Sequence, residues 1–407
     1  MQNDRLRYTL SVIWERVAIA AAVIFLSSGF QMTVAAPAAP SADWPAFHNG
    51  GMLTGEAQAI APPPMKLRWT FRAGRDEVPA TRPTTQSSLG PGHFEGSAVI
   101  ADGFVYVGDT SGVLNAIDLK SGKAKWSYRA EDGFASTPLV FNGKVLIGDE
   151  SGFFHAVKAP DGHMLWKFDA GGSPVHSSAN RQGDRIVFGT DGADIFCVDA
   201  NTGKQIWTQK AGDRINGAPA IANGVAMVSG CDAHLHAMNL SDGHEDYDVD
   251  LGALCPGSAA IDSGKMVFGT DGGRLLCLQE SNHQQAWLFD GIKNQAMVYS
   301  SPAISQGIVV FGARDRSVYG LELATGRKLW SFPTGGDVDS SPAISDGRVY
   351  IGSKDKKLYV LDLKSGRELW HFTASRGITA SPAIGEGVAI IGDSSGNLYC
   401  LEPTAGK

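Results

Sequence analysis

The stretch DLKSGRELW at residues 362–370 returns in near copy three more times along this 407-residue chain. The copies are DLKSGKAKW ending at Trp126, DANTGKQIW ending at Trp207 and ELATGRKLW ending at Trp330. Looser versions fill the intervals, so large aromatic residues recur at spacings of 40, 41, 40, 40, 43 and 40. A constant period of this size predicts a repeat architecture rather than several unrelated domains. The recurring aromatics are Trp126, Trp166, Trp207, Tyr247, Trp287, Trp330 and Trp370.

Each repeat is patterned as four short strands. In the unit from residue 340 the segments SSPAI, RVYIG, KLYVLDL and the tryptophan strand are separated by turns such as SDG and KSG. Fifty glycines and a charged fraction of 19% also favour short strands joined by tight turns. Four antiparallel strands per period are typical of a β-propeller blade. The units begin near Gly96, Ser136, Ser177, Gly217, Gly257, Ser300, Ser340 and Ala380.

The eighth unit stops at Lys407 without its tryptophan strand, while KLRWTFRAG around Trp69 has that strand and no unit of its own. A propeller leaves no open edge when its first strand completes its last blade. We therefore predict an all-β fold: an eight-bladed β-propeller over residues 65–407, closed by the Trp69 strand.

The repeated phrase is interpreted as a packing device. Its glycine suits the positive φ of a bulged turn, and its tryptophan presents a flat apolar face to the next blade. Two positions before the Asp of the phrase the residues are nearly all small, which predicts a buried column rather than metal ligands or redox cysteines. This column is Ala116, Ala156, Cys197, Ala237, Cys277, Gly320, Val360 and Cys400.

Residues 1–36 differ from the rest. Three arginines precede ten apolar residues at 17–26, and small residues follow up to VAAPAA. This pattern predicts a Sec-type signal peptide cleaved near residues 35–38, with a retained anchor as the alternative. Ten apolar residues are few for a stable transmembrane span. No cysteine follows the run, so a lipoprotein signal is not expected, and residues 37–64 form a segment before the propeller. We expect a periplasmic or otherwise exported protein.

The charge balance argues against nucleic acid. The chain carries −7, and residues 1–36 hold three arginines and two acidic residues, so the remainder carries −8. Without a basic stripe, the surface cannot neutralise phosphates. We expect a monomeric propeller with no nucleic-acid partner.

The phrases CVDANTGKQIW and VLDLKSGRELW resemble the tryptophan-docking motif of the PQQ-type propellers, and DWPAFHNGGMLTG at 43–55 resembles the segment that precedes such repeats. The resemblance spans nearly all of the chain after residue 42. It implies one of two functions. One is that of the quinoprotein dehydrogenases, and the other is that of non-enzymatic binding proteins such as the outer-membrane assembly factors of the BamB type.

In the quinoprotein dehydrogenases, the resemblance implies PQQ and Ca²⁺ in the central funnel beside a vicinal disulfide. This chain has no Cys-Cys pair, and its repeats are too short to contain the long inserts that roof such a site. Fold likeness alone cannot supply a cofactor. We therefore expect no catalytic residues, no metal and no cofactor, and keep PQQ with Ca²⁺ for the alternative.

The residue before each innermost strand is expected at one rim of the funnel. Oxygen donors there suggest a cation and Tyr299 suggests ring stacking, whether to PQQ or to a carbohydrate, although a solvated polar mouth explains the same residues. His176 has no second histidine at ligand spacing. The rim candidates are Glu95, His176, Asn216, Tyr299, Asp339 and Thr379, with Ala135 and Pro256 in the same ring.

The long segment 75–96 is predicted on the same face, either as a cover for the closure seam or as a binding loop with Arg75, Arg82 and His93. Cys231 and Cys255 fall on that face in adjoining blades, which leaves a disulfide or two free thiols. The leading hypothesis is an exported, non-catalytic scaffold that binds an envelope or outer-membrane protein. The alternative is a PQQ-dependent oxidoreductase or PQQ-binding protein.

Overall fold

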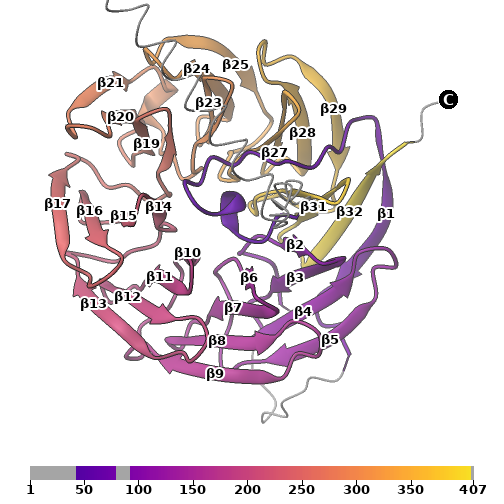
Figure 1. The fold of residues 1–407 in the computed structure, drawn as a ribbon. Helices are drawn as coiled ribbons and strands as arrows, with labels where there is room; N and C mark the ends of the chain where they lie inside the picture. Colours follow the sequence, from indigo (N-terminus) through magenta and orange to yellow (C-terminus); the bar gives the residue numbers. More distant parts are fainter. Residues whose placement is uncertain (1–42, 79–91, 405–407) are drawn as a thin grey trace, which may run out of the picture. The chain divides into compact units, whose positions relative to one another are not determined.

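The computed structural model describes residues 43–78 and 92–404. Within them thirty-two strands form eight antiparallel sheets of four, arranged as blades around a central axis (Figure 1). The predicted eight-bladed propeller is confirmed. The signal-peptide prediction falls on residues 1–36, outside the described residues, and stays a prediction. No helix in the described part of the chain is long and apolar enough to span a bilayer.

Blades one to four each run from an innermost strand of three residues to an outermost strand of six. Their strands are β2 (Val99–Ala101), β3 (Phe104–Gly108), β4 (Val113–Asp118), β5 (Ala124–Arg129), β6 (Leu139–Phe141), β7 (Lys144–Gly148), β8 (Phe153–Lys158), β9 (Met164–Asp169), β10 (Asn180–Gln182), β11 (Arg185–Gly189), β12 (Asp194–Asp199), β13 (Gln205–Lys210), β14 (Ala220–Ala222), β15 (Val225–Ser229), β16 (His234–Asn239) and β17 (Glu245–Asp250).

Blades five to eight repeat the pattern, and the last blade takes β1 as its outermost strand. Their strands are β18 (Ala260–Asp262), β19 (Lys265–Gly269), β20 (Leu275–Gln279), β21 (Gln285–Phe289), β22 (Ala303–Ser305), β23 (Ile308–Ala313), β24 (Ser317–Glu322), β25 (Lys328–Pro333), β26 (Ala343–Ser345), β27 (Arg348–Gly352), β28 (Lys357–Asp362), β29 (Glu368–Thr373), β30 (Ala383–Gly385), β31 (Val388–Gly392), β32 (Asn397–Pro403) and β1 (Met65–Arg72). Two short 3₁₀ helices are η2 (Phe47–Asn49) and η3 (Lys293–Gln295).

The ring closes where the sequence predicts. β1 pairs antiparallel with β32 along seven residue pairs, and Trp69 lies opposite Cys400. Arg68 and Lys66 form ion pairs with Glu402 at 2.6 and 3.2 Å across the same pair of strands. Figure 1 shows the indigo and yellow ends of the chain side by side in one blade.

The tryptophans join each blade to the next. Trp330 donates its indole N–H to the Leu363 carbonyl at 2.9 Å, and its ring covers Gly366, whose φ is +68°. A Cβ at Gly366 would lie 2.4 Å from that ring, so the position requires glycine for space as well as for φ. Trp69, Trp126, Trp166, Trp207 and Trp287 make the same bond to Leu119, Ala159, Ala200, Leu240 and Leu323.

The small-residue column lies directly opposite these rings within each blade. Ala116 pairs with Trp126, Cys197 with Trp207, and Gly320 with Trp330. Every member of the column is fully buried or, for Gly320, too close to Trp330 for any side chain. The three cysteines of the column are therefore packing residues in separate blades.

The segment before β1 makes a circuit around the axis at one end of the channel. Its backbone pairs with Ile100 of blade one through Trp44, and then accepts hydrogen bonds from the innermost strands of later blades (Figure 1). The donors are the N–H groups of Val140, Ile221, Ile261, Ile304 and Ile344, all at 2.8–2.9 Å, and blade three contributes the Asn180 side chain instead. One polar edge group of each of these inner strands is thereby satisfied.

Candidate functional site

The central channel is lined by hydroxyl groups that link neighbouring blades. Just before the innermost strand of seven of the eight blades, a backbone N–H donates to the hydroxyl of the next blade, as Ser97 does to Thr137 at 3.0 Å and Ser381 does to Ser97 at 3.0 Å. Further bonds of this kind run from Thr137, Ala218, Ser258, Ser301 and Ser341 at 2.7–3.0 Å. We call these residues the hydroxyl ring; Ala218, which has no hydroxyl, interrupts it.

The hydroxyl ring and η2 enclose a small pocket of about 160 Å³ on the axis. Phe47 of η2 forms part of the lining of this pocket, and the residues of the hydroxyl ring form most of the rest. The buried amide oxygen of Asn216 has no hydrogen-bond partner among the described residues. The pocket is therefore polar, narrow and suited to water or a very small ligand rather than to a large ring system.

Six of the eight predicted rim positions line this pocket: Glu95, Ala135, Asn216, Pro256, Tyr299 and Thr379. His176 and Asp339 do not. His176 instead contacts Asp191 at 3.1 Å and Glu150 at 4.0 Å, and Asp339 is held by Arg314 and Lys354. The structure thus does not join Glu95, Asn216 and Asp339 into one set of cation ligands.

Tyr299, Arg314, Asp339 and Lys354 form a polar cluster at the mouth of the channel. The Arg314 guanidinium lies 4.0 Å from the centre of the Tyr299 ring and donates two hydrogen bonds, of 2.8 and 3.0 Å, to Asp339. Lys354 adds an ion pair of 2.8 Å to the same carboxylate. Burial alone would raise the pKa of Asp339, but the bonds from Arg314 and Lys354 outweigh it and hold that pKa below its ordinary value.

Two more exposed apolar side chains lie in the loops that precede the inner strands of blades five and six. Leu254, Met297 and Tyr299 have exposed fractions of 38%, 40% and 40%. Their loops bond to the neighbouring strand turns, through Asp271 N–H to the Leu254 carbonyl and Arg314 N–H to the Met297 carbonyl. We call Leu254, Met297, Tyr299, Arg314 and Asp339 the mouth patch.

The loop candidates are only partly placed. His93 contacts the Thr110 hydroxyl at 3.0 Å and Glu95 at 3.1 Å, which anchors the end of the segment to blade one. Arg75 is exposed and closes a turn through its backbone N–H to the Arg72 carbonyl. Arg82 lies outside the described residues.

Cys231 and Cys255 lie in adjoining blades and are free thiols in the structure. Cys255 is buried, its backbone N–H bonds to the Gly230 carbonyl next to Cys231, and burial raises the pKa of its thiol to about 12. A disulfide between the two residues stays a prediction.

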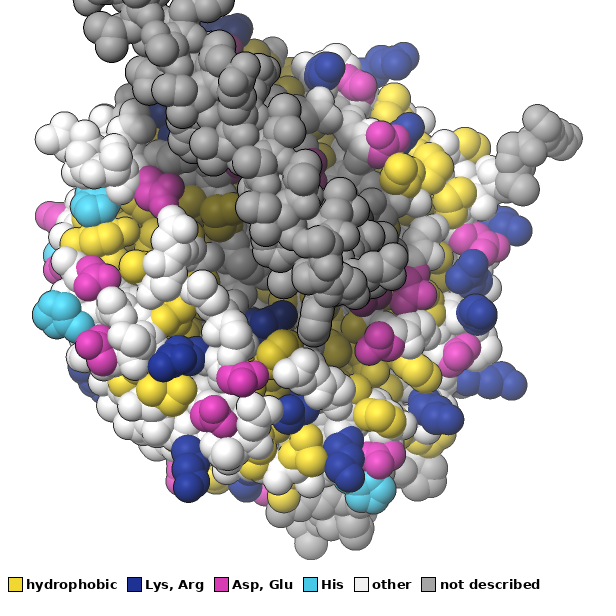
Figure 2. Space-filling model, in the orientation of Figure 1, with side chains coloured by type: hydrophobic (Ala, Val, Ile, Leu, Met, Phe, Trp, Pro, Cys, Tyr) yellow, Lys and Arg dark blue, Asp and Glu magenta, His cyan; other side chains and the backbone are white. Residues whose placement is uncertain are grey.

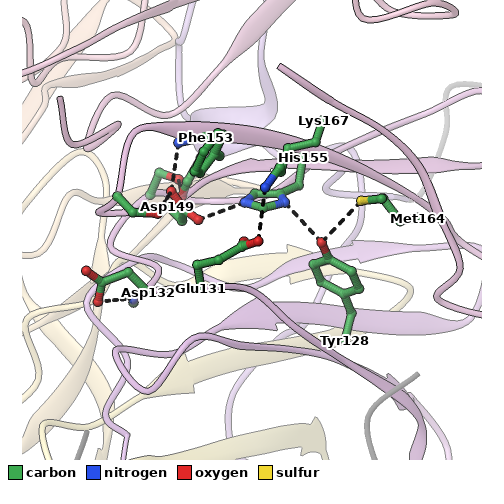
Figure 3. A network of polar contacts seen from close by, with 12 residues as sticks. Tyr128, Glu131, Asp132, Asp149, Phe153, His155, Met164 and Lys167 are labelled. Carbon is green, nitrogen blue, oxygen red and sulfur yellow. Dashed lines mark hydrogen bonds and ion pairs between the residues drawn. The ribbon is translucent and has the colours of Figure 1, made fainter. Parts of the chain in front are cut away.

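A buried polar network between blades one and two was not found from the sequence (Figure 3). His155 of β8 contacts Asp149 at 2.9 Å through Nε2 and the Tyr128 hydroxyl at 3.0 Å through Nδ1, and all three side chains are fully buried. Lys167, paired with Glu131 at 3.0 Å, lies 3.7 Å from the Phe153 ring. Asp149 also accepts the Phe153 N–H, so the network fixes the turn before β8 and has no access for a substrate.

The same device recurs elsewhere with tyrosine in place of histidine. Asp393 accepts the Tyr399 hydroxyl at 2.8 Å in blade eight, and Asp355 accepts that of Tyr359 at 2.7 Å in blade seven. The signal in the sequence is a turn carboxylate followed four or six residues later by a polar aromatic. Recurrence in several blades indicates a structural role rather than a catalytic one.

Comparison with known proteins agrees with this architecture. A relative described as outer membrane protein assembly factor BamB, from Shewanella oneidensis, is 27% identical over 161 residues, which cover 36% of this chain and 40% of that protein. Quinoprotein ethanol dehydrogenase from Pseudomonas aeruginosa is 25% identical over 188 residues, covering 44% of this chain and 25% of the enzyme. These matches thus span less than half of the curated relatives.

Solved structures share the fold at low identity. The crystal structure of BamB from Moraxella catarrhalis superposes with a TM-score of 0.67 at 15% identity, over 83% of this chain and 99% of that one. Quinohemoprotein alcohol dehydrogenase from Comamonas testosteroni gives 0.74 at 14% identity, over 91% and 83%. The family described as outer membrane protein assembly factor BamB matches residues 54–182, 155–289 and 291–407. Since these segments span most of the chain, it belongs to that family of β-propeller repeat proteins.

Proposed function

We propose that this protein is an exported, non-catalytic propeller that binds another protein of the cell envelope, in the assembly of outer-membrane proteins. The family description and the Shewanella relative support the assembly role. The mouth patch carries the proposal of protein binding. Tyr and Arg are enriched at the energetic centres of protein interfaces. Here Tyr299 is exposed and the half-buried Arg314 lies over its ring, while Asp339 holds Arg314 in place before any partner arrives.

The charge distribution suits a protein partner better than a polyanion. On the face that Figure 2 shows, Lys and Arg side chains alternate with Asp and Glu side chains rather than forming a stripe. Mixed charges around exposed apolar residues are typical of the polar rim of an interface.

The alternative is PQQ chemistry, and the described residues do not fit that cofactor. The axial pocket measures about 160 Å³, whereas sites for ligands of such size hold roughly 300–1,000 Å³. No tryptophan of the described residues lines this pocket, Arg314 already covers one face of Tyr299, and the 407 residues include no adjacent cysteines. We derive no reaction through PQQ.

Affinity purification from the native envelope tests the proposal. Wild-type protein, Tyr299→Ala and Arg314→Ala would be compared by quantitative mass spectrometry of co-purified proteins. Met164→Ala is the matched control, because Met164 is similarly exposed, at 45%, but lies on the outer strand of blade two. We expect a specific envelope protein to be lost at least tenfold from both mouth variants and retained by the control, as for hot-spot residues.

Two results would contradict the proposal. One is an unchanged set of partners in Tyr299→Ala and Arg314→Ala. The other is a stoichiometric complex with added PQQ and Ca²⁺, seen by absorbance and a raised melting temperature, together with dye-coupled oxidation of an alcohol or sugar.

A further inference from the structure

Blade four carries two histidines and several carboxylates at one edge of the propeller. His234 and His236 stand two residues apart on β16, so the strand period of two places both on one face. Asp248 of β17 pairs directly with His236, and a bulge between Ala237 and Met238 brings Glu245 to the same face. Figure 2 shows histidine and acidic side chains gathered at the edge where Figure 1 places β16 and β17.

The contacts order these side chains around His236. Its Nε2 lies 2.7 Å from an oxygen of Asp232, and its Nδ1 lies 2.8 Å from an oxygen of Glu245. His234 contacts Asp248 at 2.7 Å through Nδ1. One ligand atom each from His236, Glu245 and Asp248 lie within 4.8 Å of one another.

Burial divides the cluster into a fixed base and an open side. The side chains of His236 and Asp232 are only 10% and 6% exposed, while Glu245 and Asp248 are 41% and 43% exposed. A surface pocket lined by Cys231, Asp232, His234, His236 and Asp248 adjoins them. An ion entering from water would therefore meet the imidazole of His236, which Asp232 holds in place, and the exposed carboxylates of Glu245 and Asp248.

We propose that His236 Nδ1, Glu245 and Asp248 bind a divalent transition-metal ion of the zinc type. Asp232, bonded to the other ring nitrogen, is the positioning residue: ligating histidines usually donate their second N–H to a carboxylate, which fixes ring and tautomer. The ion takes the place of the proton shared by Nδ1 and Glu245. Mixed imidazole and carboxylate ligands suit zinc and its neighbours, and three protein ligands leave positions for water.

The buried network between blades one and two shows that close His, Asp and Glu side chains do not by themselves make a metal site. Glu131, Asp149 and His155 are equally close, but His155 and Asp149 are fully buried and Lys167 pairs with Glu131. Glu131 is exposed, but no water-facing side is left at His155 and Asp149, so an ion has no route from solvent to these two ligands. The blade-four proposal also departs from the sequence-based expectation of no metal, which considered His176 and not the H-x-H pair of β16.

Isothermal titration of the tag-free full chain with Zn²⁺, after removal of metals by chelation, tests the site. We expect one saturable site, a melting temperature that rises with Zn²⁺ because the ion binds the folded state, and a visible absorption band with Co²⁺. Glu245→Gln and Asp248→Asn, at exposed positions that should fold normally, are expected to weaken Zn²⁺ at least tenfold. Asp232→Asn should weaken it roughly 10- to 100-fold by releasing the ring.

Glu368→Gln is the matched control, because Glu368 pairs with His371 at 2.7 Å on the surface and no third ligand joins them in the described part of the chain. Its Zn²⁺ affinity should equal that of the wild type. The proposal is overturned if the wild type shows no saturable binding, or if Glu245→Gln and Asp248→Asn bind Zn²⁺ as tightly as the wild type while remaining folded by circular dichroism.

Discussion

Tyr247 stacks on His283 with ring centroids 3.6 Å apart and an angle of 20° between the planes. The equivalent pairs in six other blades are a tryptophan over a turn glycine, as for Trp207 over Gly243. His283 occupies the glycine position with a φ of +59°. A smaller ring in one blade therefore accompanies a larger residue in the next, which indicates that the two positions act as a pair.

This pairing predicts strong coupling between the two sites. Tyr247→Trp alone should destabilise the protein by about 1–3 kcal/mol, because the larger ring meets the imidazole. Adding His283→Gly should recover most of the loss by restoring the arrangement of the other blades. Chemical denaturation of the two single variants and the double variant gives the interaction free energy, expected at about 1 kcal/mol or more. Additive effects of the two changes would contradict a paired role.

The gap in the hydroxyl ring offers a stabilising substitution. Ala218→Ser places a hydroxyl where the Ser178 N–H can donate to it, as Thr137 donates to Ser178 at 3.0 Å. We expect the free energy of unfolding to rise by about 1 kcal/mol. Ser258→Ala is the opposite change, since it strips the Ala218 N–H of its acceptor at 2.7 Å and should cost about 1–3 kcal/mol. If Ala218→Ser leaves the free energy of unfolding unchanged or lowers it, the Ser178 N–H already has another acceptor.

His48 should make stability depend on pH. Burial lowers the pKa of its imidazole to about 4, against a weaker opposing effect of its bond to the Leu53 carbonyl. His48 therefore takes up a proton near pH 6.5 in the unfolded chain but only near pH 4 in the folded chain. The free energy of unfolding is therefore highest, as far as His48 is concerned, above pH 6.5. It falls by roughly 3 kcal/mol in all as the pH drops from 6.5 to about 4.

The measurement compares the unfolding free energies of wild type and His48→Gln at pH 7 and pH 4. We expect the wild type to lose more, by the amount that His48 contributes. Asp109 shifts in the other direction, because burial raises the pKa of its carboxyl to about 6, but that effect is common to both proteins and cancels in the difference. Parallel pH profiles would show that His48 is solvated in solution.

Thiol counting decides the state of Cys231 and Cys255. If they pair under oxidising conditions, protein unfolded without reductant should show three reactive thiols, from Cys197, Cys277 and Cys400, and five after reduction. Cys231→Ser should then show four in both cases. Five thiols in the unreduced wild type would contradict the predicted bond.

The 40-residue period was enough to predict the ring, because each docking tryptophan and its turn glycine are local side-chain signals. The closure by Trp69 followed from two incomplete units. The circuit of residues 44–57 could not be predicted, because it is made largely of backbone carbonyls that leave no side-chain pattern, with Asn180 as an exception. The hydroxyl ring was visible as a column of serines but depends on how closely neighbouring inner strands approach.

Site residues were harder to predict than strands. Repeat alignment assigned Tyr299 and Asn216 to the rim, and both line the axial pocket, while a ligand or partner role for them stays a prediction. The alignment could not show the ion pairs of Asp339 with Arg314 and of His176 with Asp191. In each pair the partner occupies a different position of the 40-residue repeat. The H-x-H pair on β16 was likewise visible, but its carboxylate partners lie on a different strand.

The pairing of β1 with β32 joins segments more than 320 residues apart, so β1 has no strand partner until β32 has formed. Pairing of such distant segments is slow, because the entropy of closing the long intervening loop is lost before the contacts form. A chain without β32 would thus leave β1 unpaired and the ring of blades open at this one place.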